Sequence, residues 1–428
     1  MSKGFVVSLL GLLAAAGLVL GQTPELPRPA APPGPYLEPP PPEAGRWLGS
    51  CWDCMPVFDG PDRPFLTLDA EYLLWFVQAE RPENTLTTQA FDGTTDPTGL
   101  NLRHRRRRPI PGGRFSLGYW WADYDPALPP RFRLPYAGVE VTGFFLVERS
   151  DHVESAADPT LLRPFFDINN RTPAAVLVAA PGLATGNVSA DAAFNFWGVE
   201  ANYWHNVFEN SPSTTARVDV MVGFRHLNFA SGFRVDRQTL FTPNVAALPA
   251  PLQFLAGSQL EEFDAFSTRN HFYGGQVGLN AKLYFVGAIF SADLKLALGT
   301  NDQELRIDGG QLRTDPDGTQ TTFRGALLAL PSNIGRYRRS RFAQVPEANL
   351  NIILPLSRHI TFVGGYNFLY FNRVIRAADQ VDRFIDITQI PNFPTGGALP
   401  TGQGRPGVLF RERGLFVHGA NIGVEFTW

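Results

Sequence analysis

Cys51 and Cys54 are the two cysteines of this 428-residue chain, and their Cys-Trp-Asp-Cys spacing is one of the few patterns in it that could do chemistry. In an exported protein such a pair most simply forms a local disulfide. An unpaired or labile thiol pair is the alternative. Haem attachment would need a histidine after the second cysteine, where Met55 stands. Zinc would need two further ligands and redox chemistry a βαβ setting, and this segment offers neither, so we expect no cofactor and no metal.

The seven histidines are the other candidates for catalysis, and they are scattered along the chain. His152 and His271 have acidic or hydroxyl neighbours in the sequence. No spacing, however, singles out a nucleophile together with its base. We therefore expect that the protein is not an enzyme.

A run of basic residues is a candidate binding site, and it consists of Arg103, His104, Arg105, Arg106, Arg107 and Arg108. Guanidinium groups bind anions through paired hydrogen bonds, so the run could hold anionic surface polysaccharide, cell wall or lipid head groups. A solvated loop with weak affinity for polyanions is the alternative. A second basic cluster at residues 336–341 would complete an electropositive mouth if both lie on one rim. The net charge of −3 is too small to imply a nucleic-acid partner.

The elements that would position these residues are best defined at the C-terminal end. Apolar and polar residues alternate over residues 416–428, which predicts a strand with one apolar and one polar face. The strand ends with the aromatic residues Phe426 and Trp428. Such an ending is typical of the last strand of a bacterial outer-membrane β-barrel, where it is the signal for the barrel assembly machinery. The last strand of a soluble sandwich is the alternative.

The N-terminal end indicates export. Lys3 precedes an apolar run at residues 5–20, and small residues stand just before Gln22. We therefore predict that residues 1–21 are a secretory signal peptide. The run is too short for a membrane anchor.

Three further segments follow the predicted signal peptide. Residues 24–42 contain ten prolines, which predicts that residues 22–50 form an extended periplasmic spacer. Residues 51–64 are a short segment that contains the cysteine pair. Residues 65–428 would then form the membrane domain.

Ten segments of the membrane domain show period-2 patterning. They are residues 65–79, 114–123, 136–149, 194–208, 216–236, 267–286, 288–307, 341–354, 360–376 and 415–428. Long and short connections alternate between them, as in outer-membrane barrels with short periplasmic turns and long outer loops. The predicted fold is all-β, an antiparallel transmembrane β-barrel of about ten strands. Twelve strands would result if part of loop 151–193 or loop 240–266 pairs into the wall as a hairpin.

The same alternation assigns the two faces of the wall. Val277 and Leu279 would face lipid, whereas Gln276 and Asn280 would point inward. A charged side chain facing lipid at mid-depth costs about 2 to 4 kcal/mol for Arg or Lys, so the strand charges belong in the lumen. The predicted lumen charges are Asp69, Glu71, Arg114, Glu140, Glu200, Asp219, Arg225, Lys282, Asp293, Lys295, Glu347 and Glu425.

The lumen charges leave two states open. Eight acidic positions against four basic ones would favour small cations if a pore exists. In a barrel of ten strands, however, side chains can fill much of the interior, so a salt-bridged plug is equally compatible.

Eight motifs resemble one known family. They are LDAEYLLWF at 68–76, GGRFSLGYW at 112–120, FWGVEANY at 196–203, GFRHL at 223–227, NHFYGGQVG at 270–278, FAQVPE at 342–347, GGYNFLYF at 364–371 and ADQVD at 378–382. In this order they resemble the planctomycete outer-membrane β-barrel family catalogued as the seventh beta-barrel-protein family. The resemblance implies a barrel in the bacterial outer membrane. That family has no established activity, ligand or solute, so it assigns no functional residues.

Two functions follow as hypotheses. The first is a porin-like or structural barrel, embedded in outer-membrane lipid, whose polar lumen passes small solutes or is plugged by its charges. The second is a surface-binding module, in which long loops contact anionic polysaccharide or cell wall and the barrel is an anchor. A secreted soluble β-protein is a less favoured third class, and it would be recognised by solubility without detergent.

Overall fold

The computed structural model describes a large part of the predicted membrane domain. The described residues are 65–77, 87–88, 108–122, 135–156, 160–210, 216–285, 287–357, 359–395, 399 and 401–428. The predicted signal peptide, the spacer and the segment with Cys51 and Cys54 lie outside them. Arg103, Arg105, Arg106 and Arg107 also lie outside them.

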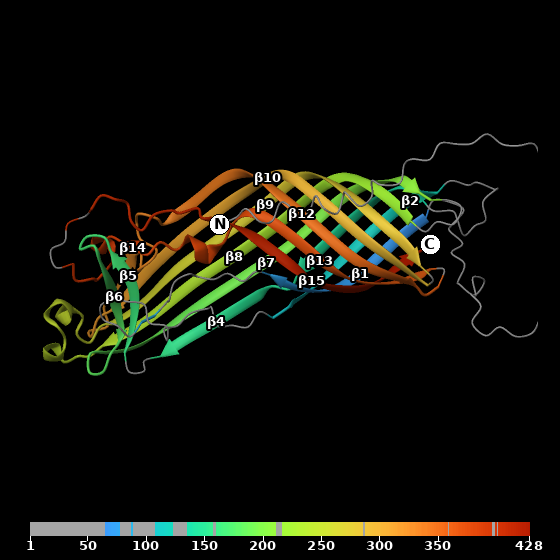
Figure 1. The fold of residues 1–428 in the computed structure, drawn as a ribbon. Coiled ribbons are helices and arrows are strands. Elements are labelled where there is room, and N and C mark those ends of the chain that lie inside the picture. The colour runs from blue at the N-terminus through green and yellow to red at the C-terminus, as the bar shows by residue number, and fades with distance from the viewer. Residues whose placement is uncertain are drawn as a thin grey trace, which may run out of the picture. The chain divides into compact units, whose positions relative to one another are not determined.

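Ten antiparallel strands form a closed ring, which confirms the predicted fold (Figure 1). In order around the ring they are β1 (Phe65–Val77), β2 (Ile110–Ala122), β3 (Pro135–Leu146), β7 (Ala184–Glu209), β8 (Ala216–Phe241), β9 (Gln259–Phe285), β10 (Ala288–Thr314), β12 (Gly335–Pro355), β13 (Ile360–Ile375) and β15 (Glu412–Thr427). The seam between β1 and β15 closes the ring, with Ala70 opposite Val424. No edge strand is left in the wall, so every strand has a partner on both sides.

The outer wall of the barrel is apolar towards the end where Phe285 of β9 lies, which we call the lower end. On β9 the outward residues from Tyr273 to Phe285 include Val277, Leu279 and Leu283, and all five are exposed large apolar side chains. The outward residues of β10 from Phe290 to Leu298 continue this surface, since residues at alternate positions of a strand share a face. We call this surface the apolar belt.

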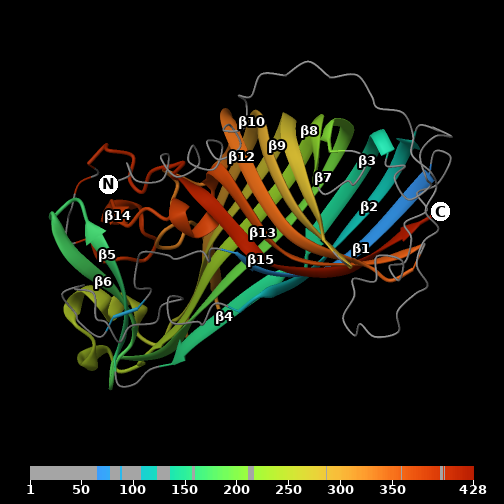
Figure 2. The ribbon, with the colours of Figure 1, turned by 45° about the vertical axis from the view of Figure 1, so that its right-hand side comes forward.

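Five strands, β7 to β10 and β12, are longer than predicted and continue beyond the apolar belt. β9 starts at Gln259 rather than at residue 267, and β7 starts at Ala184 rather than at residue 194. Above Tyr273 the outward positions of β9 become polar, starting with His271 and Arg269. We call this part of the molecule the outer extension (Figure 2).

Shorter elements complete the outer extension. β4 (Arg149–Ala156) pairs with β7, and β11 (Gln320–Arg324) pairs with β10. A separate three-stranded sheet contains β5 (Leu161–Asp167), β6 (Thr172–Ala179) and β14 (Phe384–Ile385). The β5–β6 hairpin therefore forms within the long loop 151–193 but does not join the ring, which has ten strands and not twelve.

Among the described residues, four short 3-10 helices lie in the connections. They are η5 (Val245–Ala247), η6 (Ala250–Leu255), η7 (Ala377–Gln380) and η8 (Ile387–Gln389). Within the described part of the chain, no helix is long and apolar enough to cross a membrane.

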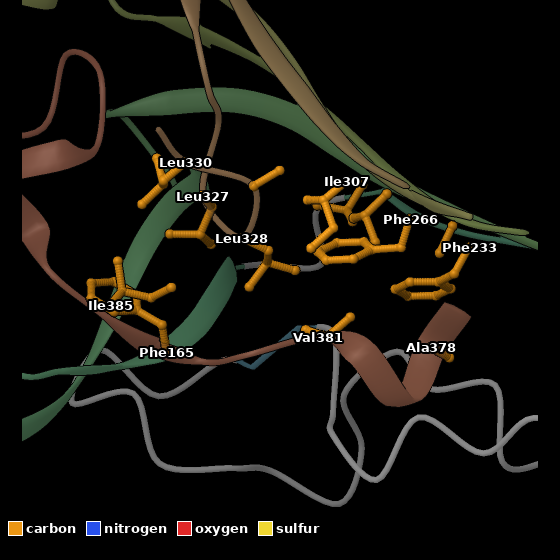
Figure 3. Close-up of a cluster of buried hydrophobic side chains, with 14 of the residues drawn as sticks. Phe165, Phe233, Phe266, Ile307, Leu327, Leu328, Leu330, Ala378, Val381 and Ile385 are labelled. Atoms are coloured by element: carbon orange, nitrogen blue, oxygen red, sulfur yellow. The ribbon is translucent and has the colours of Figure 1, made fainter. Parts of the chain in front are cut away.

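The outer extension has its own hydrophobic core. Phe233 of β8, Phe266 of β9 and Ile307 of β10 project from the inner wall into it. Figure 3 shows Ala378 and Val381 facing the rings of Phe233 and Phe266. Such a core of interlocked side chains is typical of a folded domain rather than of mobile surface loops.

Candidate functional site

Four charged residues of the lumen form one network at the level of the apolar belt. Arg225 of β8 binds Glu200 of β7, and its Nη1 atom lies 2.7 Å from Glu347 Oε2 on β12. Lys295 Nζ lies 2.5 Å from Glu200 Oε1. All four side chains are at most 10% exposed. Buried charges need partners, and this network supplies them partly between the neighbours β7 and β8 and partly across the lumen, from β8 to β12 and from β10 to β7.

A second ion pair of the lumen joins β1 to β2. Arg114 Nη2 lies 2.6 Å from Glu71 Oε2. Glu71 Oε2 also accepts a hydrogen bond of 2.8 Å from Asn421 Nδ2 on β15. Asp219, another predicted lumen charge, accepts hydrogen bonds from Arg217 Nε at 2.8 and 3.0 Å. Arg217, at the lower end of β8, was not among the predicted lumen residues.

The remaining predicted lumen charges form no ion pair at hydrogen-bond distance with a described side chain. They are Asp69, Glu140, Lys282, Asp293 and Glu425. Asp293 accepts hydrogen bonds from the amides of Asn280 and Asn351. Asp69 stands opposite Glu425 in the register of β1 and β15. A cavity of about 140 Å³ remains between the charges and is lined by Asp69, Glu71, Arg114, Glu140, Glu200, Arg225, Asp293, Lys295 and Glu347, among others. Lys282, which faces Arg217 and Ser291 in the register, is half-buried nearby.

An apolar layer closes the lumen above this network. Its buried side chains come from all ten strands of the ring and include Leu73, Phe196, Phe272, Val345 and Phe371. Phe272 of β9 and Phe371 of β13 meet with their ring centroids 5.6 Å apart, although β10 and β12 separate these strands in the wall. The layer therefore crosses the interior rather than coating it.

The end of β13 and the segment that follows it fold inward above the apolar layer. The register of β13 against β15 shifts between Phe371 and Val374, and Arg373 has a φ of 50°. The Asn270 side chain of β9 then holds the backbone of Ile375. It accepts a hydrogen bond of 2.9 Å from the Ile375 N–H and donates one of 2.8 Å to the Ile375 carbonyl. The Ala377 N–H donates to Ser231 Oγ at 3.0 Å. Residues 374–380 are thus a built-in plug that is tied to the inner wall.

A buried charge cluster lies inside the outer extension, and the sequence reasoning missed it. Arg163 of β5 binds Glu262 at 3.0 Å and Asp264 at 2.8 Å, and both acids project inward from β9. Arg237 of β8 binds Glu262 at 2.8 Å. Asp264 also accepts hydrogen bonds from the N–H groups of residues 327, 328 and 329. The only signal in the sequence was the occurrence of three acidic residues among apolar ones over 260–266.

Asp386 joins three segments of the outer extension. Its carboxylate accepts hydrogen bonds from Asn169 at 3.1 Å, from Thr388 Oγ1 at 2.6 Å and from the Thr401 N–H at 2.9 Å. Burial acts to raise the pKa of Asp386, but hydrogen bonds from Thr388, Thr401 and Asn169 outweigh it and lower the pKa to about 2. Hydrogen bonds to the ionised form favour that form.

This lowered pKa predicts a pH dependence of the outer extension. An unfolded Asp has a pKa of about 3.9, so the Asp386 contribution is complete above that pH and is lost as the pH falls towards 2. We expect pepsin cleavage near residues 384–401 to accelerate over this pH range. Pepsin should cleave the Asp386→Asn variant at a rate that changes less with pH. Equal pH profiles for the two proteins would contradict the assigned role.

The second basic cluster predicted to form a mouth is half neutralised, since its four arginines share two glutamates. Arg336 and Arg338 both bind Glu304 of β10, at 2.7 and 2.9 Å. Arg339 lies 2.6 Å from Glu412, with Arg341 at 3.7 Å. Of the first run, Arg108 alone is described; it is exposed, and its carbonyl accepts a hydrogen bond of 3.2 Å from Arg149 Nη1.

The residues of the predicted assembly signal lie at the closing seam. The Trp428 N–H donates to the Leu66 carbonyl at 3.1 Å, and the Leu66 N–H donates back at 2.9 Å. Phe426 stands opposite Leu68 and is exposed on the outer wall, as is Trp428. Recognition of these residues by the assembly machinery stays a prediction.

The described residues contain no group of three or more His, Cys, Asp or Glu side chains that could hold a metal ion. The lumen and the outer extension together therefore offer packing and ion pairing. They bring together most of the predicted charges. The prediction that the protein is not an enzyme stays a prediction.

Comparison with known proteins gives a family. The family described as "Putative beta barrel porin-7 (BBP7)" matches residues 68–428. No curated protein matches the chain. The outer membrane protease OmpT from Escherichia coli is similar at 8% identity and a TM-score of 0.38, over 85% of this chain and 97% of that one. The P. putida toluene transporter TodX is similar at 9% identity and a TM-score of 0.19, over 87% and 92%.

Proposed function

Because the chain belongs to the beta barrel porin-7 family, whose members are outer-membrane β-barrels, we propose that it is a closed barrel that anchors the outer extension at the cell surface. The apolar layer is the observation that carries this proposal, since side chains from all ten strands fill the cross-section. An ion that entered the layer would lose its water shell and meet no polar partner. The plug at residues 374–380 adds a second barrier above it.

Conductance in planar bilayers tests the proposal. The purified protein is expected to give no stepwise current. The double variant Phe272→Ala and Phe371→Ala removes two rings that meet across the lumen, and it is expected to admit ions. The matched control, Phe224→Ala and Phe342→Ala, removes two exposed rings from the outer wall and should give no stepwise current. Stepwise conductance of the unmodified protein would contradict a closed barrel.

Export follows from the same proposal. Residues 1–21 act as the signal peptide, and the proline-rich residues 22–50 are a periplasmic spacer. The mature protein is expected to begin at Gln22, to remain in the outer-membrane fraction, and to migrate differently on gels before and after boiling. Recovery in the soluble fraction with no mobility shift would contradict membrane residence.

Surface binding is a second candidate function, and the size of the outer extension favours it. Five strands and a separate sheet extend beyond the apolar belt, where they contribute nothing to spanning the membrane. An extension of this kind presents a large area to surface polymers. The basic run at residues 103–108 is the strongest candidate contact for anionic polysaccharide, because the four arginines of the cluster at 336–341 already share Glu304 and Glu412.

Binding to polygalacturonate as a model polyanion tests this second function. We expect Arg105→Ser, Arg106→Ser and Arg107→Ser together to abolish binding. The matched triple variant Arg336→Ser, Arg338→Ser and Arg341→Ser should leave most of it, because Glu304 and Glu412 offset those charges.

The salt dependence of this binding gives a second criterion. Binding of the unmodified protein should weaken as salt rises from about 0.1 M to 1 M, since the screening length falls from roughly 10 to 3 Å. Binding that ignores both salt and the first triple variant would exclude the basic run as the contact.

A further inference from the structure

The outer extension contains an apolar cavity that none of the functions above uses. Its volume is about 290 Å³, and it lies between η6, the β5–β6 hairpin, the outer ends of β8 and β9, and residues 390–394. Aliphatic, aromatic and proline side chains make up most of its lining, including Leu177, Leu183, Phe241, Leu252 and Leu255. Both the size and the lining are those of a pocket for a small ligand, at the small end of the usual range.

The polar groups of the lining are already occupied. Arg237 is the charged residue of the lining, and its guanidinium binds Glu262 at 2.8 and 3.0 Å and the Leu177 carbonyl at 3.2 Å. Asn392 donates to Gln311 Oε1 at 2.6 Å and accepts from Arg313 Nη1 at 3.3 Å. The cavity therefore offers neither a free charge nor a free hydrogen-bonding amide, which disfavours an ionic ligand.

Contacts within the protein hold the walls of the cavity together without a ligand. Arg313 of β10 holds two of them, because its guanidinium binds Asn392 and also lies 5.8 Å from the ring centroid of Phe254 on η6. Phe393 packs edge-to-face on Phe165 of β5, with ring centroids 6.0 Å apart. A preformed cavity spares a ligand the entropy cost of ordering its site.

We propose that this cavity is a binding site for a small neutral apolar molecule, with one or two rings or a short hydrocarbon chain. Water binds only weakly in an apolar cavity of this size, because a buried water molecule needs two to four polar partners. A ligand that fills it buries its surface against Leu177, Leu252 and Leu255 and gains the hydrophobic free energy of that burial. The site lies in the outer extension, so it does not depend on whether the lumen conducts.

Fluorine NMR with fluorobenzene as the probe tests the site on the full chain in lipid nanodiscs, with empty nanodiscs as the blank. The unmodified protein is expected to show a saturable change in the probe signal. Ala175→Phe places a ring in the cavity and should weaken binding roughly tenfold or more. Leu399→Phe, the same gain of an aromatic ring at an exposed position, should bind as the unmodified protein does. Leu252→Trp fills the cavity from the opposite wall and serves if Ala175→Phe does not fold.

Competition identifies the class of ligand. Cyclohexane should displace the probe, whereas benzoate, with a similar ring and a negative charge, should not. Absence of a saturable signal in the unmodified protein would overturn the proposal, as would equal binding by the filled variants and Leu399→Phe. Displacement by benzoate as effective as that by cyclohexane would overturn the assignment of a neutral ligand.

Discussion

Replacing Asp264 by asparagine is expected to destabilise the outer extension by about 3 to 5 kcal/mol, the usual cost of breaking a buried ion pair. The Asp264 side chain is 0% exposed, and one oxygen faces Arg163 while the other accepts three backbone N–H groups. An amide of the same shape must turn its NH₂ group either to the guanidinium or to those backbone donors. Both orientations place donors against donors, and both leave one buried positive charge without compensation.

Hydrogen exchange measures this effect where it arises. The amides of residues 327–329 should exchange faster by roughly a hundredfold or more, since each 1.4 kcal/mol is a factor of ten. Asp236→Asn is the matched control: its partner Arg234 is exposed, and a surface pair contributes only about 0 to 1 kcal/mol. Similar exchange rates in the two variants would exclude Asp264 as a centre of stability.

Replacing Arg225 by methionine is expected to produce a second large loss, this time in the barrel itself. The variant keeps most of the side-chain volume but leaves Glu200 and Glu347 facing each other, with Lys295 as their remaining basic neighbour. A buried charge without its partner costs about 3 to 5 kcal/mol. Adding Glu347→Gln removes one uncompensated charge and should recover part of the loss.

The urea midpoint at which the unboiled form loses its characteristic gel mobility reports barrel stability. Arg225→Met should lower this midpoint far more than Arg336→Met, whose pair with Glu304 is exposed on the arginine side. The double variant should lie between Arg225→Met and the unmodified protein. A double variant less stable than Arg225→Met would show that Glu347 is needed for reasons other than this ion pair.

All ten strands of the ring could be predicted from the sequence because lipid on one side and a polar lumen on the other impose strict alternation. The outer extension was missed because the outer face of the strands stops being regularly apolar above the apolar belt. On β8, Phe224 is exposed and Arg225 is buried, whereas ten residues later Arg234 is exposed and Val235 is buried. The pleat continues unchanged, but the outward positions are no longer regularly apolar, so the pattern of a lipid-facing wall does not locate the outer ends of the strands, such as Phe241 on β8 and Gln259 on β9.

The composition of the lumen was predictable only in part. Charged inward residues such as Glu200 stand out between apolar neighbours, but their partners depend on which strands face each other across the ring. The apolar layer gave no signal, because a residue such as Phe371 on the inside resembles Tyr370 on the outside. The pairing of Arg336 with Glu304 was hidden for a similar reason, since it depends on the register of β10 and β12.

The change of the outer face from apolar to polar also fixes how deep the molecule sits in its bilayer. From Tyr273 to Phe285 the apolar side of β9 runs about 40 Å along the strand, or about 28 Å of depth at a tilt near 45°. Sinking further would draw Arg269 into hydrocarbon, and rising would lift Phe285 into water. The length of the apolar outer face therefore matches one hydrocarbon thickness of the host membrane. A thicker bilayer must thin locally around this protein.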